Sequence, residues 1–215
     1  MKAIAIFDID GTVLPEGSAE RYLLRYLSAR GEVGIHNAVS FVGRFLLTLP
    51  TSWLMATKGN KFYLRGKSQR RIEQLAEACF YEEIAPRISR LARQKIEEHR
   101  DSGLEIVLLS GTLDVLLRHF QTHLRADHAH GATLEAAGGR YTGRISGVYP
   151  YGASKAKVVR TCYGSGSYDL SASYAYADHL SDLEFLELLG HPAVVNASSR
   201  LIRNAKRKGI GAVLF

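Results

Sequence analysis

Cysteine is scarce in this chain of 215 residues, which contains only Cys79 and Cys162. The two lie far apart and form no Cys-x-x-Cys pair, so the sequence predicts neither a disulfide framework nor a thiolate metal site. A reducing compartment suits such a chain. The first residues lead directly into an apolar run and lack the features of a signal peptide. We therefore expect a cytoplasmic protein.

Long apolar runs are also missing. The most apolar segment, residues 38–56, is interrupted by Arg44 and Pro50, whereas a membrane-spanning helix needs about 20 mostly apolar residues. The segment forms either a packed helical hairpin or a surface that contacts lipid headgroups through residues 41–55. Packing is favoured, because an apolar helical stretch belongs more often to a core. Peripheral membrane contact is the less favoured alternative.

Negative charge is in the minority, with 21 Asp and Glu against 28 Lys and Arg and a net charge of +7. Basic surfaces attract polyanions such as nucleic acids. The basic clusters at residues 65–71 and 203–208 lack interleaved aromatic side chains, so nucleic-acid binding is not expected. A positive field would equally steer a phosphorylated small molecule. The hydrophobic content of 46% fits one globular core, with or without a smaller insertion.

The most informative motif is a pair of carboxylates at the end of the first apolar run. Asp8 and Asp10 stand in the sequence Phe-Asp-Ile-Asp-Gly-Thr at residues 7–12. In an extended chain, side chains two residues apart point to the same side. Like charges this close raise each other's pKa or require a cation, so the pair predicts a shared proton or a bound divalent metal. Read alone, Asp-Gly also indicates a turn.

Apolar strands alternate with helical segments along the rest of the chain. Strands are predicted at residues 105–109, 174–177, 193–195 and 212–215, a hairpin at 138–144, and helices at 19–30, 68–79, 86–100 and 113–124 and from 183. This order predicts an α/β fold with a parallel sheet and helices on both faces. The carboxyl ends of such strands form the binding crevice. We therefore expect Asp8, Asp10, Ser110 and Asp178 to lie together.

These residue types suit phosphate chemistry. Three carboxylates without His or Cys partners favour a hard cation such as Mg²⁺. One carboxylate can attack phosphorus to form an aspartyl-phosphate, and a neighbour can carry protons. Ser110 and the amides of Gly111 and Thr112 are expected to open a helix that holds a phosphate, and Lys155 to offset its charge. Each residue considered alone has a simpler interpretation. Ser110 would be an ordinary helix cap, Lys155 would be a surface lysine, and Asp182 would cap the helix from residue 183.

In this order the motifs resemble those of haloacid dehalogenase-like phosphatases, closest to the phosphoserine-phosphatase-like branch. The matching segments are residues 8–12, residues 109–112, Lys155, and residues 176–183 with Val195-Asn196. The resemblance implies a Rossmann-like core formed by residues 1–14 and 85–215. It also implies a small helical cap, residues 15–84, inserted after the first strand.

The resemblance further implies an Mg²⁺-dependent phosphomonoester hydrolase for a small phosphorylated metabolite. Asp8 would be the nucleophile and Asp10 the general acid and base. The other implied roles are metal binding by Asp8, Asp178 and the backbone carbonyl of Asp10, phosphate binding by Ser110, Gly111 and Lys155, and support by Thr12 and Asp182. Lys157 is the alternative to Lys155 for the phosphate-binding lysine, because either residue can be aligned with the lysine of the family's third motif.

Two departures from the family pattern concern the substrate. His179 stands where close relatives usually carry a small residue, so an imidazole borders the metal site. Phosphoserine-specific relatives place a cap glutamate where this chain has Gly17, and Glu16 falls one position short. Phosphoserine is therefore not the expected substrate. The alternative functions are a lipid-phosphate phosphatase with a membrane-contacting cap and a non-catalytic regulator that binds phosphate and metal.

Overall fold

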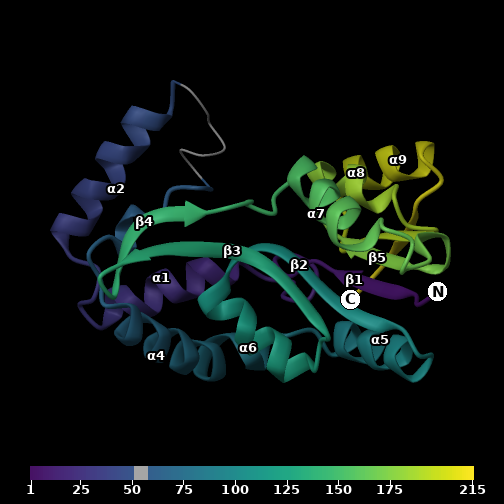
Figure 1. Cartoon of the computed structure of the whole chain (residues 1–215), viewed down its shortest axis with the longest axis horizontal. Coiled ribbons are helices and arrows are strands. Elements are labelled where there is room, and N and C mark those ends of the chain that lie inside the picture. The colour runs from purple at the N-terminus through teal and green to yellow at the C-terminus, as the bar shows by residue number, and fades with distance from the viewer. Residues whose placement is uncertain (51–57) are drawn as a thin grey trace.

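A computed structural model describes residues 1–50 and 58–215. Within these ranges the centre of the molecule is a seven-stranded sheet in the order β4-β3-β2-β1-β5-β6-β7 (Figure 1). The strands are β1 (Ile4–Phe7), β2 (Glu105–Leu113), β3 (His128–Ala137), β4 (Arg140–Ser146), β5 (Tyr174–Ala177), β6 (His191–Val195) and β7 (Gly211–Val213). All neighbouring strands run parallel except β3 and β4, which form an antiparallel hairpin. The predicted α/β class is confirmed.

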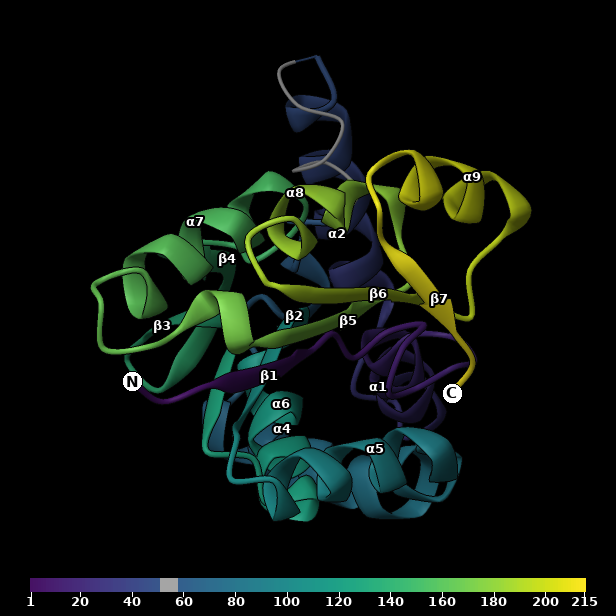
Figure 2. The same ribbon diagram turned by 90° about the vertical axis from the view of Figure 1, so that its right-hand side faces the viewer.

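Helices cover both faces of the sheet, with α4, α5 and α6 below it and α7, α8 and α9 above it in Figure 2. The helices are α1 (Ala19–Ala29), α2 (Ile35–Thr48), α4 (Gln69–Cys79), α5 (Arg90–Asp101), α6 (Asp114–Leu124), α7 (Ala153–Tyr163), α8 (Leu183–Leu186) and α9 (Ser199–Arg207). The side chains of Ser18, Ser68 and Ser89 accept backbone N–H groups at the starts of α1, α4 and α5. Serine caps of this kind satisfy amides that have no partner inside a helix.

The first strand explains why its sequence reads as an unbroken apolar run. Ala5 and Phe7 face the hydrophobic cluster beneath the sheet, and Ile4 and Ile6 face a second cluster above it. A strand buried on both faces needs apolar residues at every position rather than at alternate ones. Hydrophobic packing on both faces of the sheet therefore holds β1 up to Phe7, the residue directly before Asp8.

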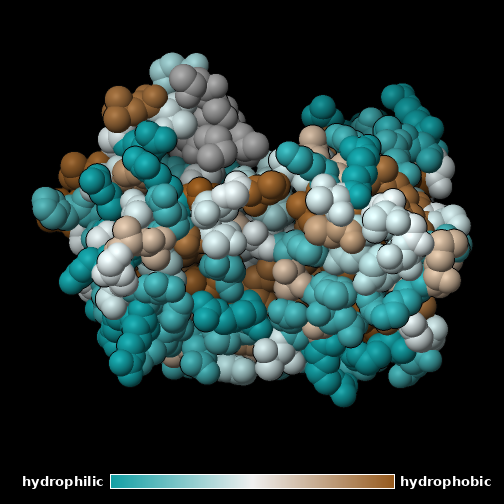
Figure 3. Space-filling model, in the orientation of Figure 1, coloured by the Kyte–Doolittle hydropathy of each residue, from teal (hydrophilic) through white to brown (hydrophobic). Residues whose placement is uncertain are grey.

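Helix α2 is less buried than the sequence led us to expect. Ile35, Val39, Val42 and Leu46 keep between 52% and 85% of their surface exposed, and hydrophobic side chains are visible among hydrophilic ones over α2 at the upper left of Figure 3. The polar Asn37 lies on the buried face instead, where its side chain donates to the backbone carbonyl of Arg65 at 3.2 Å. Trp53, Leu54 and Met55, from the same apolar segment, lie outside the described residues. Among the described residues, no helix has the length and apolarity needed to cross a membrane.

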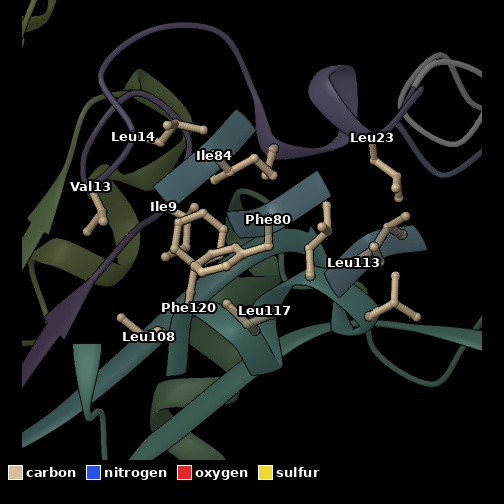
Figure 4. Close-up of a cluster of buried hydrophobic side chains, with 14 of the residues drawn as sticks. Ile9, Val13, Leu14, Leu23, Phe80, Ile84, Leu108, Leu113, Leu117 and Phe120 are labelled. Carbon is tan, nitrogen blue, oxygen red and sulfur yellow. The ribbon is translucent and has the colours of Figure 1, made fainter. Parts of the chain in front are cut away.

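The inserted helices α1 and α4 share the cluster beneath the sheet. Leu23 of α1 and Phe80, which follows α4, pack in one group with Leu108 of β2 and Phe120 of α6 (Figure 4). The Phe80 and Phe120 rings meet edge to face, with their centroids 5.0 Å apart. This packing fixes α1 beside the end of β1. The division into a core and a cap of residues 15–84 stays a prediction.

Replacing Phe120 with alanine tests this shared cluster. Phe120 has no exposed surface, so Phe120→Ala is expected to lower the free energy of unfolding by about 3–5 kcal/mol through lost burial and a residual cavity. Urea unfolding followed by circular dichroism measures the change. The matched control is Leu91→Ala on α5, where the side chain is 48% exposed and the expected loss is below about 0.5 kcal/mol. Similar losses in both variants would contradict the packing described here.

Candidate active site

Three adjacent strands deliver polar side chains to one cavity of about 370 Å³. Asp8 and Asp10 follow β1, Ser110 lies in the last part of β2, and Asp178 follows β5. β1 lies between β2 and β5, and at such a branching point the loops at the strand ends leave a crevice. The structure thus brings together the four residues that the strand order predicted to meet.

Lys155 joins two of the carboxylates. It lies in the first turn of α7 and is 2% exposed, with its Nζ 3.0 Å from Asp8 Oδ2 and 2.9 Å from Asp182 Oδ2. Burial by itself would lower the pKa of Lys155, but the charges of Asp8 and Asp182 outweigh it and raise the pKa. Lys157 is exposed and lines a different cavity, bordered by β3 and α7. Asp182 directs its side chain to Lys155 and forms no side-chain cap at the start of α8.

A carboxylate cluster surrounds this ion pair. One oxygen each from Asp8, Asp178 and Asp182 lies within 4.8 Å of the others, the only such group of His, Cys, Asp or Glu among the described residues. Burial first, and then the charges of Asp8 and Asp182, raise the pKa of Asp178 to about 7. Burial and Asp8 likewise raise the pKa of Asp182 to about 6, against the opposing effect of Lys155. Several carboxylate oxygens this close, each costly to ionise, suit a hard divalent cation.

Asp10 points away from that cluster, toward α1. Its Oδ1 accepts the backbone N–H of Ala19, the first residue of α1, at 2.8 Å. Burial, followed by the nearby charges of Asp8 and Glu20, raises the pKa of Asp10 to about 7, although the bond from Ala19 opposes the shift. A carboxyl group with this pKa can both give and take a proton near neutrality.

The segment after Ser110 differs from the prediction. The sequence predicted that the strand ends at residue 109 and that the amides of Gly111 and Thr112 open the following helix, but β2 continues to Leu113 and α6 begins at Asp114. The reason is a register shift between β2 and β3, after which Leu113 pairs again with a β3 residue. Ser110 Oγ instead accepts the N–H of Thr112 at 3.3 Å. Ser110 and Gly111 still line the cavity.

Gly11 is required by the close approach of Asp178. Its φ of +83° is in the left-handed region, and a Cβ there would lie 2.0 Å from Asp178 Oδ2. Asn196, after β6, donates from Nδ2 to the Gly11 carbonyl at 3.0 Å. The neighbouring Thr12 is fully buried, and its Oγ1 has no hydrogen-bond partner in the described part of the chain. The loop after β1 is therefore held from β5 and β6 as well.

Sequence reasoning missed an acid in the cavity wall, Glu20. Its Oε1 accepts the hydroxyl of Tyr63 at 2.8 Å, and its Oε2 forms an ion pair with Lys61, which is 1% exposed. Glu16, which the sequence singled out, is exposed and is not part of the lining. Glu20 is the second residue of α1, whereas Glu16 precedes the helix. The signal was the serine cap at Ser18, which starts α1 and sets the phase of its side chains.

Other lining residues were also unforeseen. The rings of Tyr149 and Tyr151 are stacked with centroids 6.0 Å apart, and Lys58 Nζ lies 5.8 Å from the centroid of Tyr151. These residues lie in irregular segments, where side-chain periodicity gives no signal. His179 lines the cavity as well, with Nδ1 accepting the N–H of Ser181 at 3.2 Å. The imidazole therefore borders the carboxylates, as the sequence indicated.

Removing the buried ammonium tests the electrostatics of the site. In Lys155→Met, Asp182 loses its cation, so its pKa in the folded protein, already raised to about 6, rises further above the unfolded value. A carboxyl with a raised folded pKa binds more protons when folded, and stability is lost as the pH rises. We expect Lys155→Met to cost about 3–5 kcal/mol near pH 8 and much less near pH 5. Urea unfolding in excess chelator measures both values.

The control is Lys157→Met, which alters the exposed lysine two residues further along α7. It is expected to change the free energy of unfolding by less than about 0.5 kcal/mol at either pH. A pH-independent loss in Lys155→Met, or an equal loss in the control, would contradict the assigned ion pair.

Some known proteins with similar sequences are phosphatases by name. A histidinol-phosphatase of Neisseria meningitidis is 28% identical over 97% of this chain and 97% of its own length. A phosphoserine phosphatase of Mycobacterium tuberculosis is 28% identical over 97% of this chain and 70% of its length. The chain spans about half the length of another curated relative, a probable phosphatase of M. tuberculosis, with 29% identity over 67% of this chain and 50% of that protein.

The fold has a near neighbour among solved structures. A protein of unknown function from Bordetella pertussis Tohama I superposes with a TM-score of 0.81, over 99% of this chain and 98% of that one. The two are 22% identical, so this likeness shows the fold alone. The model of the family described as haloacid dehalogenase-like hydrolase matches residues 5–187, which include β2, β5, all of β1 but its first residue, and every residue of the carboxylate cluster. The chain belongs to the haloacid dehalogenase-like hydrolase family.

Proposed function

We propose that this protein is an Mg²⁺-dependent phosphomonoester hydrolase that acts on a small phosphorylated metabolite through an aspartyl-phosphate on Asp8. The observation that carries the proposal is the different setting of two carboxylates in one cavity. Asp8 is paired with the buried Lys155, whereas Asp10 is turned toward α1 and has a pKa of about 7. Two carboxyl groups in such unlike environments can divide nucleophilic and proton-transfer roles. The phosphatase names of the relatives support this reaction class.

The chain's own donors fit a magnesium ion. The oxygens of Asp8, Asp178 and Asp182 converge without nitrogen or sulfur donors, and oxygen ligands are those that Mg²⁺ prefers. Asp8, Asp178 and the backbone carbonyl of Asp10 would hold the ion, with Asp182 in support. When bound, it would neutralise charge on the phosphate and on the carboxylates.

In the first step, a carboxylate oxygen of Asp8 attacks phosphorus, and the bond to the ester oxygen breaks. That oxygen leaves with the proton of Asp10, so the products are a free alcohol and an aspartyl-phosphate. The hydrogen bond from Ala19 keeps the Asp10 side chain in place, and its raised pKa supplies the proton near neutrality. This arrangement supports the roles proposed for the two aspartates.

In the second step, water hydrolyses the intermediate. Asp10, now ionised, takes a proton from the water as its oxygen attacks phosphorus, and the bond to Asp8 breaks. Inorganic phosphate is released, Asp8 is again a carboxylate and Asp10 is again an acid. Both steps use the same two residues. Asp10 acts as an acid in the first step and as a base in the second.

Ser110, Gly111 and Lys155 would hold the phosphoryl oxygens during both steps. Ser110 and Gly111 line the cavity from β2, and Lys155 lines it from α7. A buried ammonium that already contacts the nucleophile can offset charge that develops on phosphorus. The exposure of Lys157 favours Lys155 for this role. Thr12 would support the loop that carries the two aspartates.

The cavity supports a small substrate. Its volume of about 370 Å³ is near the lower end of the usual range for ligand sites, about 300–1,000 Å³. The acid in its wall, Glu20, already shares its charge with Lys61, and Glu16 lies outside the lining. We therefore do not assign phosphoserine as the substrate, although one relative bears that name. A screen of phosphorylated metabolites with Mg²⁺ would identify the leaving group.

Two substitutions separate the proposed roles of the aspartates. With Mg²⁺ and p-nitrophenyl phosphate, Asp8→Asn is expected to lower phosphate release by at least about 10³-fold, because no intermediate forms. Asp10→Asn still transfers the phosphoryl group, since p-nitrophenolate leaves without a proton, but hydrolyses the intermediate slowly. Acid-quenched samples analysed by mass spectrometry should show a phosphorylated Asp8 peptide in Asp10→Asn and none in Asp8→Asn. Unchanged turnover in Asp8→Asn, with a native circular dichroism spectrum, would sink the proposal.

Magnesium binding should become stronger as the pH rises. The pKa values of Asp178 and Asp182, about 7 and about 6, mean that protons compete with the cation in acid. Mg²⁺ is therefore expected to raise the melting temperature more near pH 8 than near pH 6. Differential scanning fluorimetry with and without Mg²⁺ measures the shift. Asp178→Asn should lose most of it, and an undiminished shift in that variant would place the ion elsewhere.

A further inference from the structure

The outer face of α2 carries several exposed apolar side chains. Ile35, Val39, Val42 and Leu46 follow the spacing that places residues on one side of a helix. Their exposed fractions are 85%, 64%, 52% and 61%, and Leu47 beside them is 75% exposed. A solvated helix face normally carries charged residues at such positions. An apolar patch of this kind marks a contact surface.

The chain around α2 is unusual in its charge as well. Residues 33–72 contain no Asp or Glu and hold seven basic residues, Arg44, Lys58, Lys61, Arg65, Lys67, Arg70 and Arg71. The nearest acids on either side are Glu32 and Glu73. Lys61 is buried against Glu20 and Arg71 pairs with Glu32, so the other basic residues of this segment are those suited to a negatively charged partner.

Arginines gather beside the apolar face. A cavity of about 780 Å³ between α2 and the β3–β4 hairpin is lined by the exposed Arg44, Arg65, Arg140 and Arg144. Leu47 lines it too, so the cavity borders the apolar surface. Among the described residues that line it, Glu135 is the only acid, and its carboxylate accepts the hydroxyl of Thr142. Four guanidinium groups with a single acid among them favour binding of phosphate groups.

We infer that α2 and the arginine cavity form a docking surface for an anionic lipid bilayer, with Ile35, Val39, Val42, Leu46 and Leu47 entering the headgroup region. Apolar side chains bordered by basic ones are the pattern of helices that lie in a membrane interface. A second copy of the chain fits this surface less well than a bilayer does, because a twofold interface would place two copies of the same basic surface against each other. An anionic bilayer offers an apolar region to the side chains of α2 and phosphate groups to the arginines of the cavity.

The docking surface is connected to the active site by a short segment. Asn60 donates from Nδ2 to the backbone carbonyl of Phe41 in α2, at 3.0 Å. Next to it, Lys61 pairs with Glu20 in the wall of the catalytic cavity, and Lys58 lines the same cavity. A bilayer bound at α2 would thus lie beside the segment that closes one side of the catalytic cavity. The inference concerns where the enzyme works and goes beyond the proposed reaction.

Vesicle flotation with the whole protein tests the inference. We expect the protein to float with vesicles of phosphatidylglycerol and phosphatidylcholine, but not with phosphatidylcholine alone, and to bind less as salt is added. Leu46→Glu should lower the partition coefficient by at least about tenfold. The matched control, Leu91→Glu, changes another exposed helical leucine and should bind like the wild type. Arg44→Gln with Arg144→Gln should weaken binding to the anionic vesicles.

Hydrolysis of p-nitrophenyl phosphate in solution is the second readout. It should be unchanged in Leu46→Glu, because this side chain lies outside the catalytic cavity. Absence of flotation by an active enzyme, or equal flotation by Leu46→Glu and the wild type, would overturn the inference. Loss of a dimer in Leu46→Glu, seen by sedimentation, would also overturn it by assigning the face to a second copy. Flotation by an inactive protein would support docking and refute the proposed reaction instead.

Discussion

The buried ammonium of Lys155 is the contact on which the catalytic centre depends. Asp8 follows β1, Asp182 precedes α8 and Asp178 follows β5, so the topology forces three carboxylates into a space with little water. Without a cation, their mutual repulsion and desolvation would oppose folding. Lys155 offsets part of that cost by contacting Asp8 and Asp182. The charge that remains is what makes the centre able to receive a divalent ion.

Helix α1 links the inserted segment to this centre. Its first amide binds Asp10, Glu20 in its first turn lines the cavity, and Leu23 packs in the cluster beneath the sheet. These contacts fix the cavity wall to the same core that supports β1. Helix α2 packs through Asn37 and Phe41, while Ile35, Val39, Val42 and Leu46 on its outer side are exposed. The segment between β1 and β2 therefore contributes both a wall of the cavity and an exposed apolar helix face.

Much of the site was predictable because it depends on strand order rather than on detail. The alternation of strands and helices places Asp8, Asp10, Ser110 and Asp178 at neighbouring strand ends, wherever the exact boundaries fall. Other features depend on local geometry that a single sequence leaves open. The sequence predicted that this strand ends at residue 109, yet pairing with β3 resumes at Leu113. Burial of α2 was expected from composition, but composition does not say which face of a helix meets the core.

The bond between Asn196 and Gly11 spans 185 positions of the sequence. During synthesis the loop with Asp8 and Asp10 is therefore made long before the side chain that fastens it. Contacts of such long range form slowly, since the intervening chain must be ordered before they are made. The pocket around Asp8 is therefore assembled only after Lys155, Asp178 and Asp182, which lie far along the chain, have been made and folded.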